Sequence, residues 1–251
     1  MERLRKITKN EIYLNELNNE NDWIDLSINY RLSQSIIEEF ADKVDWDLVS
    51  IHQKLSDKFI EKYSDRINWK RIFTVRQFSE EFIEKHLDKV DWDIICVCQT
   101  LSEEFMEKHS SKLRWSLVCD YQKLSESFME RHIDKLNWDV ICVHQTLSEP
   151  FIEKFANKLN WHRISGYQKL SESFMKRHID KLNWKYISRY QKLSERFIDK
   201  YNNRVHWLNI SQFQKLSESF IEKYKDKVYW EYIFIHQTLS KKFKEKYKNM
   251  I

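Results

Sequence analysis

The stretch LSESFMERHIDKLNWDVICVHQT, from Leu124 to Thr146, contains the pattern that decides the fold. In its first half, Ser125 is a residue type favoured as a helix N-cap, and an acid, Glu126, follows it in the expected first turn. Apolar or amphipathic side chains then follow at spacings that form one continuous face of a helix: Phe128, Met129, His132, Ile133 and Leu136. The pattern predicts a first helix that begins after Ser125 and has Lys135 in its last turn.

The second half of this stretch predicts a second, shorter helix. Asn137 is its expected N-cap, and the helix should run from Trp138 to about Gln145 with Trp138, Ile141 and Cys142 on its inward face. Helices of this length are unstable alone in water, where roughly 12 to 15 residues are already marginal. The two helices must therefore gain their stability by packing against neighbours.

The same pattern recurs along the chain with a period of 23 residues and without insertions. Trp occurs at 23, 46, 69, 92, 115, 138, 161, 184, 207 and 230, and the N-cap Ser occurs at 33, 56, 79, 102, 125, 148, 171, 194, 217 and 240. A fixed period of this length is typical of repeat architectures. We predict an all-α protein, an α-solenoid of about ten tandem two-helix repeats plus a terminal capping helix. It should form a single domain over residues 1–251.

Both ends of the chain depart from the repeat, as caps of a solenoid should. Residues 1–32 are predicted to form an N-terminal capping repeat, in which Asn10 replaces the Ser and the helix keeps Tyr13, Leu14 and Leu17. Residues 33–239 form the regular repeats. Residues 240–251 form a C-terminal capping helix, in which Lys244 stands where other units have Ile or Met. The chain should thus contain eleven first helices and ten second helices.

Composition excludes several classes of protein. With one Gly among 251 residues, the sequence cannot encode a Rossmann fingerprint, a P-loop or a nucleophile elbow, and most β architectures are disfavoured. No apolar run reaches the length of a membrane span, and the N-terminus lacks the apolar core of a signal peptide. We expect an intracellular, cytoplasmic protein that does not contact membranes and whose four Cys stay reduced.

The repeat unit reads L-S-x-x-F-[IM]-E-K-x-x-D-K-[VIL]-[DN]-W-x-x-I over nearly the whole chain. This unit resembles short Trp-containing helical repeats in uncharacterised proteins of large DNA viruses and phages. If the chain is viral, its location would be the host cytoplasm. The resemblance supports the fold class and implies no activity.

Histidines recur at two repeat positions where other units have aromatic residues. His86, His109, His132 and His178 share a position with Phe and Tyr in other units; His52, His144 and His236 share one with Tyr121, Tyr167, Tyr190 and Phe213. We predict that both sets pack as amphipathic rings and do not act as bases.

The other candidate chemical groups also have structural interpretations. Cys96, Cys119 and Cys142 occupy one position in successive units, too far apart to share a tetrahedral zinc, and Cys98 adds only a C-x-C pair. We interpret the repeated Ser as helix N-caps. The Gln that occurs seven residues after most Trp can form hydrogen bonds with the following turn or stack as a ladder along the solenoid; the alternative is that these amides recognise nucleic-acid bases. We therefore predict no enzyme, no metal and no cofactor.

The residues that vary between units lie 1, 2 and 5 positions after each Trp, on the side of the second helix opposite the packed face. A constant framework with a varied surface is how solenoids build binding faces. Some of these positions are apolar and predict a protein interface, unless they belong to the core: Leu48, Ile51, Ile94, Val97, Val140 and Val143.

Further along the chain the same positions become basic, amidic and aromatic. The residues concerned predict a ligand-binding surface: Arg163, Lys185, Tyr186, Arg189, Asn209 and Gln212. They lie in a basic segment, since residues 161–251 contain 20 Lys and Arg against 9 Asp and Glu, whereas residues 1–160 contain 23 against 30.

Three functions follow from these surfaces. The leading hypothesis is a non-enzymatic interaction scaffold that binds a protein partner through the variable surface of the second helices. The alternative is a binder of single-stranded nucleic acid, or of a nucleotide-like anionic small molecule, through residues 161–251. A third is head-to-tail self-association between the acidic and basic segments of two copies.

Overall fold

The computed structural model describes residues 5–6 and 20–250, and its elements are almost all helices. The exception is a parallel pair of two-residue strands, β1 (Arg5–Lys6) and β2 (Tyr30–Arg31), in which Arg5 lies opposite Tyr30. The predicted all-α solenoid is confirmed. The residues predicted to form the first helix of the N-terminal cap, Asn10 to Leu17, lie outside the described part of the chain.

The helices alternate as two types through the described residues. The first helices are α2 (Gln34–Glu39), α4 (Asp57–Lys62), α6 (Glu80–Lys85), α8 (Glu103–Lys108), α10 (Glu126–Arg131), α12 (Glu149–Lys154), α14 (Glu172–Arg177), α16 (Glu195–Lys200), α18 (Glu218–Lys223) and α20 (Lys241–Tyr247), which a 3₁₀ turn (Lys248–Met250) follows. The second helices are α1 (Glu20–Asn29), α3 (Trp46–His52), α5 (Trp69–Val75), α7 (Trp92–Cys98), α9 (Trp115–Tyr121), α11 (Trp138–His144), α13 (Trp161–Tyr167), α15 (Trp184–Tyr190), α17 (Trp207–Phe213) and α19 (Trp230–His236).

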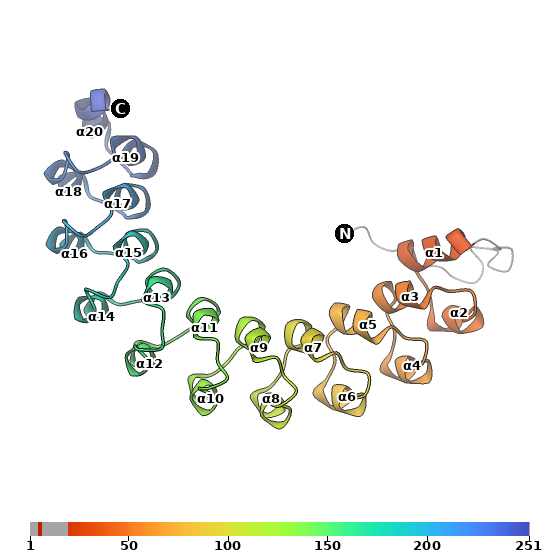
Figure 1. Ribbon diagram of the computed structural model, residues 1–251. Coiled ribbons are helices and arrows are strands. Elements are labelled where there is room, and N and C mark those ends of the chain that lie inside the picture. The colour runs from red at the N-terminus through yellow and green to blue at the C-terminus, as the bar shows by residue number, and fades with distance from the viewer. Residues whose placement is uncertain (1–4, 7–19, 251) are drawn as a thin grey trace. The chain divides into compact units, whose positions relative to one another are not determined.

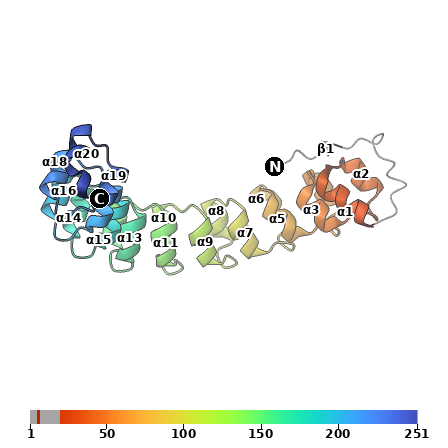
Figure 2. The same ribbon diagram turned by 90° about the horizontal axis from the view of Figure 1, so that it is seen from above.

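The chain divides into two compact units, Met1–Gln122 and Lys123–Ile251. Within each unit the second helices form one row and the first helices form another (Figure 1). Successive second helices lie side by side and make the closest backbone contacts, as Figure 2 also shows for each unit. A single domain over all 251 residues stays a prediction.

The first helices are shorter than the sequence predicts. α10 ends at Arg131, so Lys135 lies in a turn beyond the helix instead of in its last turn. His132 is the C-cap, and the turn is closed by a bond of 2.8 Å from the Lys135 N–H to the His132 carbonyl. The N-cap prediction is confirmed, because the Ser125 side chain accepts from the Phe128 N–H at 3.1 Å. The second helix also begins at Trp138 as predicted.

The Trp side chains hold these turns and join neighbouring repeats. The Trp46 indole N–H donates to the Ala41 carbonyl at 2.9 Å, just after the end of α2, and other units repeat this bond. This bond ties the start of the second helix to the turn that follows the first helix. The same ring packs against Tyr63 of the next repeat at 5.0 Å.

The repeated Gln forms a buried ladder between repeats, at the C-cap of the second helix. Gln191 accepts from the Leu170 N–H at 3.0 Å, and its amide nitrogen donates to the Ser165 and Gln168 carbonyls at 3.0 and 2.7 Å. The same three bonds to the preceding repeat are made by Gln53, Gln99, Gln122, Gln168, Gln214 and Gln237. The structural interpretation is confirmed. Base readout by these amides is wrong, because their atoms bond to the backbone.

Candidate functional site

The exposed face of the first helices is a ladder of ion pairs between successive repeats. Lys85 pairs with Glu61 at 2.7 Å and Lys108 with Glu84 at 2.6 Å. In the second unit, Lys154 pairs with Glu130 at 2.7 Å and Arg177 with Glu153 at 2.8 Å. Many charges on this face are thus paired with a charge of a neighbouring repeat.

The second helices carry a different surface, on which large apolar and aromatic side chains are exposed near the helix C-termini. Those in the first unit are Val75, Val97 and Tyr121, and those in the second unit are Tyr167, Tyr190, Phe213 and Ile235. We call these the terminal residues of the second helices. They lie five or six residues after the Trp of their repeat, and exposed aromatic and aliphatic groups of this kind form a contact surface.

One of our predictions is therefore wrong. The position shared by His52, His144, His236 and the Tyr residues was expected to pack, but all three His are exposed, and Tyr121, Tyr167 and Tyr190 have exposed fractions of 55%, 58% and 54%. Six residues after Trp, at about 100° per residue, a side chain has turned about 240° and has left the inward face. The last residue of such a short helix also has no following turn to cover it.

In the second unit, four of the six predicted ligand-binding residues line one hollow between α15 and α17. The hollow has a volume of about 210 Å³ and is lined by Lys185, Tyr186, Arg189, Tyr190 and Asn209. The Arg189 guanidinium lies over the rings of Tyr190 and Phe213, at 5.2 and 4.8 Å from their centroids. A cation is thus held between two exposed rings from neighbouring repeats.

Gly166, the only glycine in the sequence, gives the Tyr186 ring its place. A Cβ at Gly166 would lie 2.6 Å from Cδ1 of Tyr186, closer than real Cβ contacts come. The Tyr186 ring also meets the His162 ring edge-on, at a centroid distance of 4.4 Å. The glycine therefore allows the tyrosine to pack on α13 and form a fixed wall of the hollow.

The hollow lies in a positive environment. α13, α15 and α17 contain no Asp or Glu. Arg163, on α13, pairs with Asp139 at 3.2 Å. By contrast, Lys185 and Arg189 form no ion pair with any carboxylate among residues 20–250. Two cations beside exposed aromatic rings could bind phosphate or carboxylate groups together with planar groups.

Asn209 lines the hollow from below its surface, whereas Gln212 and Arg163 lie outside the hollow. Asn209 is only 4% exposed, and its amide nitrogen donates to the Lys185 carbonyl at 2.8 Å, so it supports the wall of the hollow. Gln212 is half-buried on α17 and does not line the hollow. Arg163 is exposed on the neighbouring α13.

The six predicted interface residues are not brought together. Leu48 and Ile51 lie on α3, Ile94 and Val97 on α7, and Val140 and Val143 on α11 in the other unit. All are half-buried except Val97, which is exposed. Within the first unit α5 lies between α3 and α7, and its exposed Lys70 and Arg71 interrupt the apolar surface.

The remaining candidate chemical groups have structural partners. His109 and His178 pack on Trp92 and Trp161 at 5.2 and 4.9 Å, which confirms the packing prediction for this position. Cys96 and Cys142 are buried, and burial raises the pKa of each thiol. Among the residues described, no group of three or more His, Cys, Asp or Glu could hold a metal ion, and no helix is both long and apolar enough to cross a bilayer.

Sequence reasoning missed Tyr190 and Phe213 as members of this surface. The signal that could have identified them was the recurrence of an aromatic residue beside Gln-Lys, as in Tyr167, Tyr190 and Phe213, in three successive repeats. Comparisons of the chain with protein-family models, with curated proteins and with solved structures found no match. The resemblance to viral and phage repeats therefore stays a prediction.

Proposed function

We propose that this protein is a non-enzymatic interaction scaffold that binds a protein partner through the row of second helices. The observation that carries the proposal is the contrast between its two faces. On the first-helix face many charges are paired between repeats, whereas seven of the ten described second helices expose an apolar or aromatic terminal residue. Exposed aromatic residues and arginine are the side chains that dominate binding energy in protein interfaces.

The non-enzymatic part of the proposal rests on the structural use of the candidate catalytic groups. The repeated Ser cap helices, His109 and His178 fill aromatic positions, and the repeated Gln bond the backbone. The first-helix carboxylates bind cations of the next repeat. These groups are thus engaged in holding the repeats together.

A photo-crosslinking experiment tests the proposal in the protein's own cellular setting. A benzophenone amino acid replaces Tyr121 in one variant and Tyr190 in another, and the matched control replaces Glu104, which is exposed on the first-helix face of α8. We expect protease-sensitive adducts of defined mass at Tyr121 and Tyr190 and none at Glu104. Equal adducts at all three positions would mean that the second helices are not a specific binding face.

A second candidate function is favoured by the unpaired Lys185 and Arg189 beside the exposed rings of Tyr190 and Phe213. This surface suits single-stranded nucleic acid, in which phosphates bind cations and bases stack on aromatic rings, at roughly 1–3 kcal/mol per stacked base. In the crosslinking experiment, an adduct at Tyr190 that is sensitive to nuclease and resistant to protease would favour it.

Salt dependence tests the second candidate directly. If the surface binds a labelled oligonucleotide, affinity should fall steeply with salt, and changing Arg163, Lys185 and Arg189 together to Ala should reduce the slope of log K against log salt by up to about 2. The control variant changes Lys154, Arg177 and Lys223, which are cations of the first-helix face. An equal reduction of the salt slope in the control would show that binding depends on the overall positive charge and not on this surface.

A further inference from the structure

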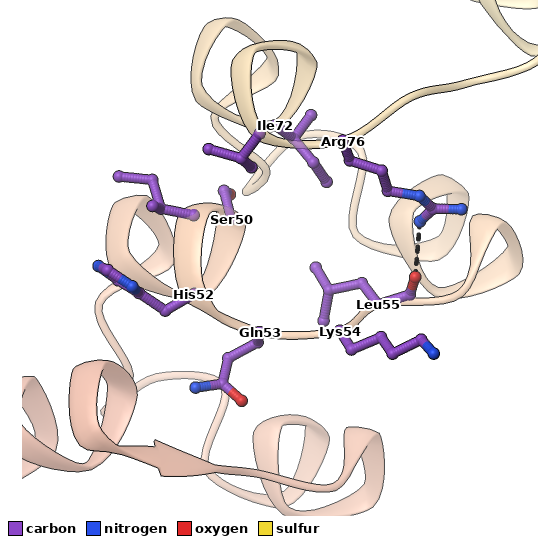
Figure 3. A pocket seen from close by; sticks show the side chains of 9 residues that line it. Ser50, His52, Gln53, Lys54, Leu55, Ile72 and Arg76 are labelled. Carbon is purple, nitrogen blue, oxygen red and sulfur yellow. Dashed lines mark hydrogen bonds between the residues drawn. The ribbon is translucent and has the colours of Figure 1, made fainter. Parts of the chain in front are cut away.

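The Gln ladder is interrupted at one repeat, and a hollow lies at the interruption. Seven residues after Trp69, where most other units have Gln, the residue is Arg76. The hollow has a volume of about 370 Å³ and is lined by residues of α3, α5 and the segment that follows α3, among them Ser50, Gln53, Leu55 and Arg76 (Figure 3). All of these residues belong to the first unit.

The ladder defines which backbone groups its missing member would bind. Each ladder Gln accepts from the N–H 21 residues earlier and donates to the carbonyls 26 and 23 residues earlier, as Gln99 does with Phe78, Phe73 and Arg76. Counted back from position 76, the corresponding groups are the Leu55 N–H and the carbonyls of Ser50 and Gln53. These three residues line the hollow.

Arg76 does not take over these bonds. Its guanidinium donates to the Leu55 carbonyl at 2.6 Å, pairs with Asp57 and lies over the Phe78 ring at 4.5 Å from the centroid. Figure 3 shows Arg76 reaching Leu55 at one side of the hollow, while the Gln53 side chain points away toward the preceding repeat. Within the described chain, no hydrogen bond reaches the Leu55 N–H or the Ser50 and Gln53 carbonyls.

We propose that this hollow binds a glutamine side chain of a protein partner, whose primary carboxamide replaces the missing member of the ladder. A carboxamide offers one acceptor for the Leu55 N–H and two donors for the Ser50 and Gln53 carbonyls. A carboxylate has no donor for the carbonyls, and an ammonium group has no acceptor for the N–H. Of these three side-chain groups, only the amide matches all three backbone groups.

The walls of the hollow fit the rest of a glutamine side chain. Ile51, Ile72 and Val75 line it and offer apolar contacts to the two methylene groups. Its volume of about 370 Å³ is many times the roughly 30 Å³ that one water takes up in the liquid. The inference deepens the proposed function, since the glutamine would belong to the protein partner, but its test needs no partner.

The test follows the Leu55 amide by NMR in the full chain. The probe is N-acetyl-glutamine methylamide, and the matched compounds are the glutamate and methionine analogues. We expect the glutamine probe to shift the Leu55 N–H resonance in a saturable way, and the two analogues to bind at least about tenfold more weakly because they leave one or more groups unpaired. An unmoved Leu55 resonance, or equal shifts with the methionine compound, would overturn the proposal.

Two variants complete the test. Arg76→Gln should restore the ladder, so the Leu55 N–H should exchange at least about tenfold more slowly than in the original protein and the probe should no longer bind. Arg76→Met removes the guanidinium without supplying an amide, and should keep probe binding. If Arg76→Gln protects Leu55 no better than Arg76→Met, the three backbone groups do not form a carboxamide site. Crosslinking at Tyr121 and Tyr190 does not involve this hollow, so a failure here leaves the scaffold proposal to be judged separately.

Discussion

Gln168 illustrates how a single side chain joins two repeats. Its amide accepts from the Leu147 N–H at 2.9 Å and donates to the Cys142 and Gln145 carbonyls at 2.9 and 2.7 Å, all in the preceding repeat. The side chain is buried, so its removal leaves three backbone groups without their partner in a site shielded from bulk water. The energetic importance of the residue therefore lies in the backbone groups that it satisfies.

Replacing Gln168 by Ala should destabilise the protein by about 2–4 kcal/mol, because three buried backbone groups lose their partner. The measurement is the urea midpoint of unfolding followed by circular dichroism. The neighbouring Lys169 is exposed, and Lys169→Ala should change the free energy of unfolding by less than about 0.5 kcal/mol. Equal effects of the two substitutions would contradict a structural role for the ladder.

The contact between Gly166 and the Tyr186 ring leads to a second prediction. The φ of Gly166 is not positive, so in a helix Ala would normally be more stable than Gly by about 1 kcal/mol. Here a Cβ would meet the Tyr186 ring at 2.6 Å. We expect Gly166→Ala to destabilise the original protein but to stabilise the Tyr186→Ala variant. A double-mutant cycle of unfolding free energies measures this coupling. Additive effects would contradict the prediction, because they would show that the Tyr186 ring moves aside without loss of stability.

At the scale of the element, each first helix is bound to the next by carboxylates that accept from cations. The hydrogen bond from Lys108, aided by His109, lowers the pKa of Glu84, and Arg177 with His178 does the same for Glu153. Lys85 lowers the pKa of Glu61 in the same way. Three equivalent positions thus share one cause of a lowered pKa.

This arrangement predicts acid sensitivity. Because the folded pKa values of these Glu lie below the ordinary value of 4.5, the unfolded chain takes up protons first as pH falls. The stabilisation is fully present above the unfolded pKa and is lost as pH falls through the folded pKa. We expect the melting temperature to fall below about pH 4.5, and less steeply when Glu84 and Glu153 are both changed to Gln. An identical pH profile for the double variant would contradict this prediction.

At the scale of the whole molecule, stability should depend on the number of repeats and on their register. In each unit the helices contact mainly neighbouring repeats, so a complete repeat can be removed if the helices before and after it still match. Residues 147–169 form such a repeat, and their removal would join Thr146 to Leu170, as Thr146 is now joined to Leu147.

Excision of residues 147–169 should leave a folded protein with the same helical signal per residue and a lower melting temperature. Excision of residues 147–158 is the control, because it removes a first helix and leaves two second helices in sequence without the partner that covers them. We expect the control to lose cooperative unfolding. Circular dichroism and thermal melting measure both outcomes, and equal stability of the two deletions would contradict a register-dependent stack.

The sequence by itself determined the repeat, the alternation of two helix types, the Ser125 N-cap and the start of the second helix at Trp138. These features depend on interactions between residues a few positions apart, and 3.6-residue periodicity reports such interactions directly. The outward position of Arg163, Lys185 and Arg189 followed from the same geometry, because positions 1, 2 and 5 after a Trp point away from the packed face.

Only the tertiary structure decided where the first helices end, which groups the Gln bind and which terminal residues of the second helices are exposed. The Trp46 indole N–H binds the Ala41 carbonyl in the turn after a first helix, and the Gln191 amide binds the Leu170 N–H of the preceding repeat. The hydrophobic periodicity of the sequence does not reveal such bonds. The hollow at Arg76 had the same origin. A single change in one ladder position leaves three backbone groups of another repeat unpaired, because their partner lies 21 to 26 residues away along the chain.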